Sequence, residues 1–93
     1  METEADFDFI ANRYKNSPLS EGKMKMTESF ADYLEGINDL AKVKKGVDYI
    51  ILFRNQIPST YRQYTDPMFN NILSGVAKNK GQEIKDYIYQ KMK

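Results

Sequence analysis

The stretch LAKVKKGVDYIILFRNQIP, residues 40–58, decides the fold class. Its apolar residues recur at spacings of three and four, which places them on one face of a helix with lysines and polar residues elsewhere. They are Leu40, Val43, Val47, Ile50, Ile51 and Ile57. The β-branched run YIILF would suit a strand, but its flanks keep the helical period over about four turns.

Two residues punctuate this helix. Pro58 disfavours helical backbone in the residue before it, so the helix should end at Ile57 or earlier. Gly46 weakens the helix by ~1 kcal/mol relative to Ala. It would permit either a kink or the close approach of a neighbouring element.

Helical patterns also precede this stretch. The first runs from Phe7 to Tyr14 and stops at Ser17-Pro18, because the residue before Pro18 is biased away from helix. The polar segment SPLSEGK, residues 17–23, reads as a loop. A second helix is expected with Thr27 as its N-cap and an end near Gly36, and Asn38 or Asp39 can cap the helix that follows. Its apolar stripe is Met26, Phe30, Tyr33, Leu34 and Ile37.

The C-terminal third predicts two more helices. Residues 59–65, STYRQYT, form either a short helical turn or a loop. Asp66-Pro67 is typical of a helix start, with Asp66 as N-cap and Pro67 in the first turn. Gly81 should end that helix, since glycine is favoured just after a helix C-terminus. The expected apolar stripes are Phe69, Ile72, Leu73 and Val76, then Ile84, Tyr87 and Ile88.

The fold class is therefore all-α, with about five short antiparallel helices in a single domain, residues 1–93. Residues 1–5 should be frayed. No exact internal repeat is visible. Helices of this length joined by short turns suit either a small helical bundle or a HEAT/armadillo-like array of helix pairs.

Composition excludes several kinds of chemistry. The 93 residues include no His, Cys or Trp. Without them there is no disulfide framework, no thiolate zinc site and no Ser–His–Asp triad. We therefore expect no enzyme activity, no catalytic or metal-binding residue and no cofactor in this chain. The longest apolar run, residues 47–53, is too short for a membrane span, and METEADFDFI lacks the apolar core of a signal peptide.

Charge is unevenly distributed along a nearly neutral chain. There are 14 Lys and Arg against 13 Asp and Glu, a net charge of +1. Residues 1–39 carry nine acids and four bases (−5), and residues 40–93 carry ten bases and four acids (+6). This polarity could steer a partner, or it could reflect solvated helix faces that differ in sign. Lys dominates over Arg, so we expect no nucleic-acid partner.

Four residues around Pro58 are the candidate site: Arg54, Tyr61, Arg62 and Tyr64. Arg guanidinium groups and Tyr hydroxyls suit a peptide carboxylate or a domain interface. The alternative is structural. In that case Arg54 or Arg62 caps carbonyls at the end of the third helix, and the tyrosines pack.

Three stretches carry a resemblance to a known family. They are FDFIANRY (residues 7–14), FRNQIPSTYR (53–62) and NNILSGVAKNKG (70–81). Their order and spacing resemble the extreme C-terminal helical region of aminopeptidase N-type zinc metallopeptidases. The carrying features are an aromatic first helix, a helix that finishes in Phe53-Arg54, and a final helix with a basic end, Asn70 to Lys80.

The resemblance implies a non-catalytic module of a peptide hydrolase. In that family the tail is a HEAT/armadillo-like layer that packs beside the catalytic domain and restricts the route to its active site. The zinc and its H-E-x-x-H motif would lie in the parent, and no family catalytic residue has a counterpart here. An extracytoplasmic parent would be natural, although the compartment stays open. The alternative is a free-standing all-α adaptor that binds another protein through an apolar helix groove.

Overall fold

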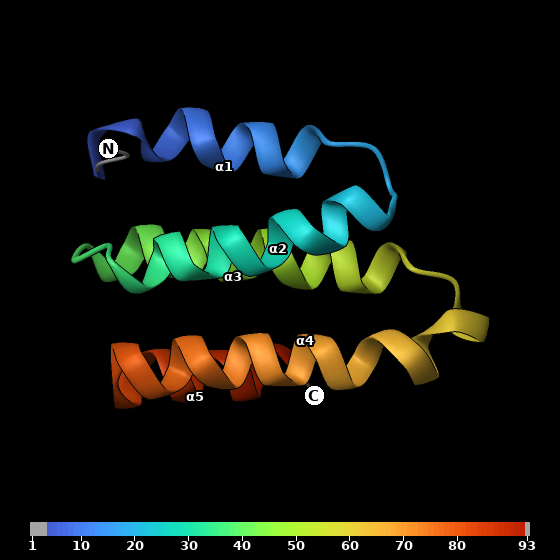
Figure 1. Ribbon diagram of the computed structural model, residues 1–93. Coiled ribbons are helices and arrows are strands. Elements are labelled where there is room, and N and C mark those ends of the chain that lie inside the picture. Colours follow the sequence, from blue (N-terminus) through green and yellow to red (C-terminus); the bar gives the residue numbers. More distant parts are fainter. Residues whose placement is uncertain (1–3, 93) are drawn as a thin grey trace.

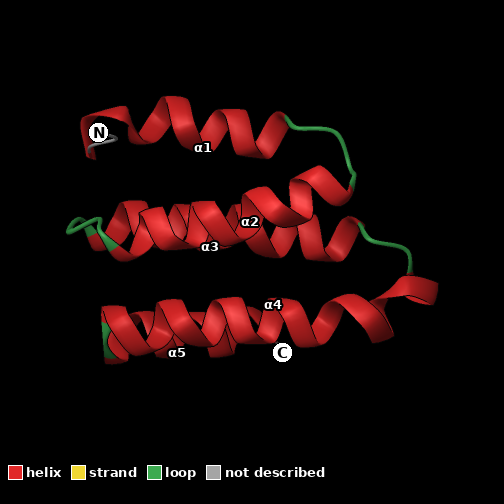
Figure 2. Ribbon diagram, in the orientation of Figure 1, coloured by secondary structure: helices red, strands yellow, loops and turns green. Residues whose placement is uncertain are grey.

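The computed structural model describes residues 4–92 (Figure 1). This part of the chain contains α-helices, one short 3₁₀ helix and no strand (Figure 2). The all-α prediction with five helices is therefore confirmed. The elements are η1 (Glu4–Asp6), α1 (Phe7–Asn16), α2 (Glu21–Glu35), α3 (Leu40–Gln56), α4 (Ser59–Lys80) and α5 (Gln82–Met92).

The helices form two stacked antiparallel hairpins, α2–α3 and α4–α5. Helix α2 lies beside α4, α3 lies beside α5, and α1 packs against both α2 and α3 (Figure 1). The result is a slab of 36 × 27 × 15 Å. Its short dimension fits two layers of helices, because packed helix axes lie about 8–10 Å apart.

Helix α3 is the centre of the core. Among the described helices it is the one that contacts all four others. Val43, Val47 and Ile50 are fully buried, as the helical spacing predicted. Phe53 extends the core toward α1 and α4 through edge-to-face contacts with Tyr14 and Phe69.

Gly46 permits the close approach of α2 to α3. The glycine is buried, and a Cβ built on it would lie 2.7 Å from Leu34 Cδ1 and 3.1 Å from Leu34 Cγ. Leu34 is itself fully buried. Of the two roles that the sequence allowed, the structure therefore assigns close approach to Gly46.

The start of α2 was predicted wrongly. The helix begins at Glu21, six residues before the expected Thr27, and Ser20 is its N-cap, with its side chain accepting the Lys23 N–H at 3.2 Å. Thr27 is buried within the helix and donates to the Lys23 carbonyl. The first turn contains a single large apolar residue, Met24, and therefore no stripe marked it.

The start of α4 was also predicted wrongly. Helix α4 begins at Ser59 and continues through Asp66-Pro67, so residues 59–65 are neither a loop nor a separate turn. Pro67 cannot donate to the Gln63 carbonyl, and the first part of α4, yellow in Figure 1, bends away from the rest. Both residues are exposed, so solvent can satisfy that carbonyl.

Other boundaries agree with the predictions. Asp39 caps α3 by accepting the Ala41 N–H at 3.0 Å, and Gly81 ends α4 with a φ of 92°. The frayed segment was expected to include Glu4, but Glu4 begins η1 and its carboxylate accepts the Asp39 N–H at 2.8 Å. Residues 1–3 lie outside the described residues.

The two hairpins share a sequence pattern that the search for exact repeats missed. In α2 and the turn after it the sequence is FADYLEGI (30–37), and in α4 it is FNNILSGV (69–76). Phe, Leu and Gly coincide, and the last position is Ile or Val. In the second helices of the two hairpins, VKKGV (43–47) matches IKDYI (84–88). The shared apolar positions are buried in both hairpins.

Substitution of Gly46 tests the approach of α2 to α3. We expect Gly46→Ala to lower the free energy of unfolding by about 1–3 kcal/mol, because Leu34 must move within a close-packed core. Gly75→Ala is the matched control. Its Cβ would have no neighbour nearer than 3.5 Å, so the helical propensity of Ala should raise stability by about 0.5–1 kcal/mol. Urea unfolding followed by circular dichroism measures both, and equal effects would contradict the close contact.

Candidate interaction site

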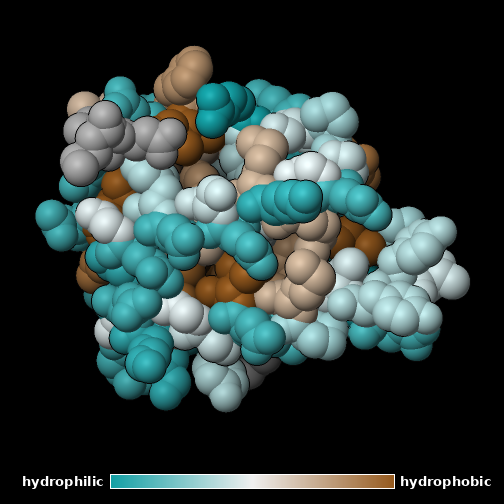
Figure 3. All heavy atoms as spheres, viewed as in Figure 1, coloured by the Kyte–Doolittle hydropathy of each residue, from teal (hydrophilic) through white to brown (hydrophobic). Residues whose placement is uncertain are grey.

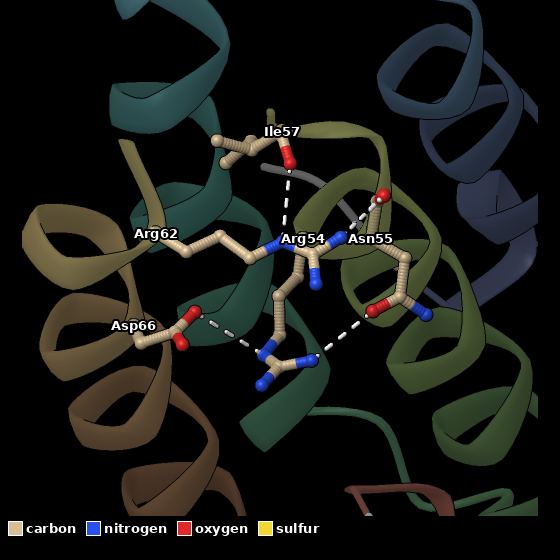
Figure 4. A network of polar contacts seen from close by, with 5 residues as sticks. All are labelled: Arg54, Asn55, Ile57, Arg62 and Asp66. Atoms are coloured by element: carbon tan, nitrogen blue, oxygen red, sulfur yellow. Dashed lines mark hydrogen bonds and ion pairs between the residues drawn. The ribbon is translucent and has the colours of Figure 1, made fainter. Parts of the chain in front are cut away.

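The structure divides the four candidate residues into two pairs. Figure 4 shows the first pair, Arg54 and Arg62, with its polar partners. Arg62 belongs to the structural pair. Its Nε donates to the Ile57 carbonyl at 3.1 Å, and its Nη2 donates to the Asn55 carbonyl at 2.8 Å. These carbonyls end α3, where no intrahelical donor remains for them. Arg62 thus makes the capping contacts of the structural alternative.

Arg54 joins α3 to α4. Its Nη1 donates to Asn55 Oδ1 at 3.1 Å, and its Nε lies 3.6 Å from Asp66 Oδ1 in an ion pair. The Arg54 side chain is only 20% exposed. Together with Arg62 it ties the first turns of α4 to the end of α3, which makes this corner rigid.

Tyr61 and Tyr64 project into solvent instead. They are 61% and 69% exposed and lie one helical turn apart near the start of α4. They line an open groove of about 460 Å³, here named the tyrosine groove. Its lining residues are Leu19, Ser20, Glu21, Met24, Phe53, Ile57, Pro58, Tyr61, Tyr64 and Thr65.

The lining of the tyrosine groove is mostly apolar and aromatic. Glu21 is the one charged residue in its lining, while Leu19, Ile57 and Pro58 supply apolar surface. Thr65 Oγ1 is buried and makes no hydrogen bond within the described residues. The groove therefore combines aromatic and apolar surface, as protein-binding surfaces commonly do.

The opposite wall of the groove is formed at a second corner, the junction of α1 and α2, which is stabilised in the same way. Lys23, near the start of α2, donates from Nζ to the carbonyls of Lys15 (3.2 Å) and Ser17 (3.0 Å) at the end of α1. These carbonyls lie three residues and one residue before Pro18, as those of Asn55 and Ile57 do before Pro58. Each corner is thus a proline followed by a cation that caps the preceding helix.

The sequence analysis missed Lys23 because it placed the residue in a loop. Lys23 is 3% exposed, and its ammonium lies 5.3 Å from the Tyr14 ring centroid and 5.0 Å from that of Phe53. Burial lowers the pKa of Lys23, whereas the aromatic faces and the helix C-terminus favour its charged form. The signal that could have found it is the repeated order of proline and then a basic residue.

Tyr14 of α1 stabilises the same corner. Its hydroxyl forms a 2.8 Å hydrogen bond with Thr27 Oγ1, and its ring stacks on Phe30 at 4.6 Å. Burial raises the pKa of Tyr14 to about 12, partly offset by the hydrogen bond with Thr27. Tyr14 therefore stays protonated and hydrogen-bonded well above neutral pH.

A third cation caps the second helix. Lys80, at the end of α4, donates from Nζ to the carbonyls of Glu35 and Ile37 at 3.2 and 2.5 Å. The C-terminal carbonyls of α1, α2 and α3 are thus each bonded by a basic side chain from another helix. Several of the basic residues that the composition left unassigned have this structural role.

No group of three or more carboxylates within residues 4–92 lies close enough together to hold a metal ion. In the same range no helix is long and apolar enough to cross a membrane.

Comparison with known proteins identifies no relative. No protein-family model, curated protein or solved structure matches the chain. The resemblance to aminopeptidase N-type enzymes therefore stays a prediction that depends on the three stretches quoted above.

Replacing Arg62 tests the α3 cap. Arg62→Met keeps the apolar stem but removes two hydrogen bonds from a charged donor, so we expect the free energy of unfolding to fall by about 1–3 kcal/mol. Arg13→Met, on the exposed face of α1, is the control and should change stability by less than about 0.5 kcal/mol. Urea unfolding measures both, and equal effects would mean that Arg62 does not cap α3.

The pH dependence of stability tests Tyr14. The pKa in the folded protein, about 12, lies above the ordinary value of 10.0. The stability contributed by protonated Tyr14 is thus complete below pH 10 and is lost as the pH rises to 12. Relative to Tyr14→Phe, the native chain should lose about 2 kcal/mol between pH 9 and pH 12. Parallel stability curves over this range would contradict the buried hydroxyl.

Proposed function

We propose that this chain is a non-catalytic helical docking module. Its tyrosine groove packs against a surface of a neighbouring domain in the same polypeptide. The single observation that carries the proposal is the pair Tyr61 and Tyr64, which expose more than 60% of their surface beside an apolar groove. Exposed aromatic residues on a rigid scaffold lose little entropy on binding and are enriched in protein interfaces.

The rigid corner supports this role. Arg62 and Arg54 hold the start of α4 on α3 through side-chain hydrogen bonds and an ion pair. The two tyrosines therefore keep their relative positions without a partner. Such preorganisation reduces the cost of ordering the interface on binding.

The identity proposed for the parent is a zinc aminopeptidase. Support comes from the three stretches that resemble its C-terminal region and from the stacking of the two hairpins. Equivalent residues of the hairpins, such as Phe30 and Phe69, are about 40 positions apart, the period of HEAT and armadillo repeats. In this proposal zinc and peptide hydrolysis belong to the catalytic domain, and the module shapes the route of substrates to it.

The second candidate is a free-standing adaptor. It is favoured by the fact that the groove is built from the chain's own α2, α3 and α4 and the α1–α2 loop. Such a groove could receive a segment of an unrelated protein. Neither candidate requires a nucleic acid, a membrane or a small-molecule cofactor.

An immunoblot of source-cell lysate separates the two candidates. An antibody raised against the 93 residues should detect a band much larger than 10.9 kDa if the chain is a module of a larger protein. A single band at the mass of the chain would overturn the module proposal and favour the adaptor.

Capture experiments then test the groove itself. A tagged full chain should retain its partner domain or protein, and Tyr61→Ala or Tyr64→Ala should reduce retention about tenfold, the effect of losing one well-packed aromatic contact. Phe9→Ala, which removes an equally exposed ring from α1 (70% exposed), is the matched control. Undiminished capture by the tyrosine variants, with unchanged circular dichroism, would exclude this groove as the docking surface.

A further inference from the structure

A second groove lies on the edge of the slab formed by α4 and α5. It has a volume of about 500 Å³, and its residues are Asn70, Leu73, Ser74, Ala77, Lys78, Lys85, Ile88, Tyr89 and Met92. The buried side chains of Leu73 and Ile88 belong to it, and Lys78 and Lys85 are exposed. No acidic residue lines the groove, and it shares no residue with the tyrosine groove.

The internal repeat shows what this surface corresponds to in the first hairpin. When VKKGV (43–47) is matched with IKDYI (84–88), Lys85, Tyr89 and Met92 of α5 correspond to Lys44, Asp48 and Ile51 of α3. Each residue of the α3 set is less exposed than its α5 counterpart. The exposed face of α5 is therefore the counterpart of a face that is covered in α3.

The element that covers this face in the first hairpin is a helix. Glu83 of α5 lies 3.2 Å from Lys44 in an ion pair. Tyr87 of α5 donates to Asp48 at 2.7 Å, and the Lys44 ammonium lies 5.5 Å from the Tyr87 ring centroid. Lys44 is the counterpart of Lys85. The chain itself therefore contains an example of how this position binds a carboxylate from a parallel helix.

We propose that the α4–α5 groove binds an acidic amphipathic helix of a partner protein. Its apolar stripe covers Leu73, Ile88 and Met92, and its carboxylates pair with Lys78 and Lys85. The helix runs parallel to α5, as α5 runs parallel to α3 (Figure 1). On the face shown in Figure 3, apolar surface appears as patches between hydrophilic residues. This inference concerns a different surface from the proposed function and does not depend on it.

A designed peptide provides the probe. An end-capped 15-residue helix carries Glu, Ile, Tyr and Ile at the spacing of Glu83, Ile84, Tyr87 and Ile88, with Ala and Gln elsewhere. A second peptide has Lys in place of Glu. Nuclear magnetic resonance titration of the labelled full chain should show shifts at Lys78, Lys85 and Tyr89 with the acidic peptide. The lysine peptide should bind about tenfold more weakly, because charge complementarity is reversed.

Charge reversal in the chain completes the test. Lys85→Glu should weaken binding of the acidic peptide about tenfold and strengthen binding of the lysine peptide. Lys25→Glu makes the same charge change at an exposed position of α2, and it should alter the binding of neither peptide. Equal binding of both peptides, or no shifts at all, would overturn the proposal. Shifts confined to α3 would also overturn it, because they would mean that the peptide displaces α5. Shifts that depend only on the concentration of the chain would overturn it as well, because they would report a second copy of the chain in the groove.

Discussion

The contact between Leu34 and the bare backbone of Gly46 is the constraint on which the rest of the structure depends. It brings α2 close to α3, the helix that touches all the other helices of the described chain. Leu and Val are scarce in this chain, so a close-packed core around α3 needs neighbouring helices that lie near its axis. The glycine weakens α3 locally, but it permits the packing that stabilises α3 globally.

Capping by cations is the second organising feature. Lys23, Arg62 and Lys80 each bond carbonyls at the end of a helix other than their own. Every short helix has four carbonyls without intrahelical donors, so these caps matter most in a fold made of short helices. Lys23 and Arg62 join successive helices, and the tyrosine groove lies between the two corners that they stabilise.

The two grooves lie at different places in the fold. The tyrosine groove lies where helices begin and end, and its aromatic side chains are held by the α3–α4 corner. The α4–α5 groove lies on the long edge of the slab, where stacking of hairpins stops. In a repeat array the terminal face needs either polar residues or a partner, because each hairpin buries its apolar face on its neighbour. Both proposals therefore describe a protein that works by association.

The sequence alone determined the helical class, the position of most apolar residues and the helix end at Gly81, and it narrowed the α3 cap to Asn38 or Asp39, because these depend on spacing and on local backbone chemistry. It grouped Tyr61 and Tyr64 with Arg54 and Arg62 in one candidate site and could not separate the two exposed tyrosines from the two arginines. Only the tertiary structure decided that α4 continues through Pro67, that Lys23 is buried and that Gly46 contacts Leu34. Each of these depends on contacts between residues far apart in the chain, and such contacts can outweigh a local preference of a few kcal/mol.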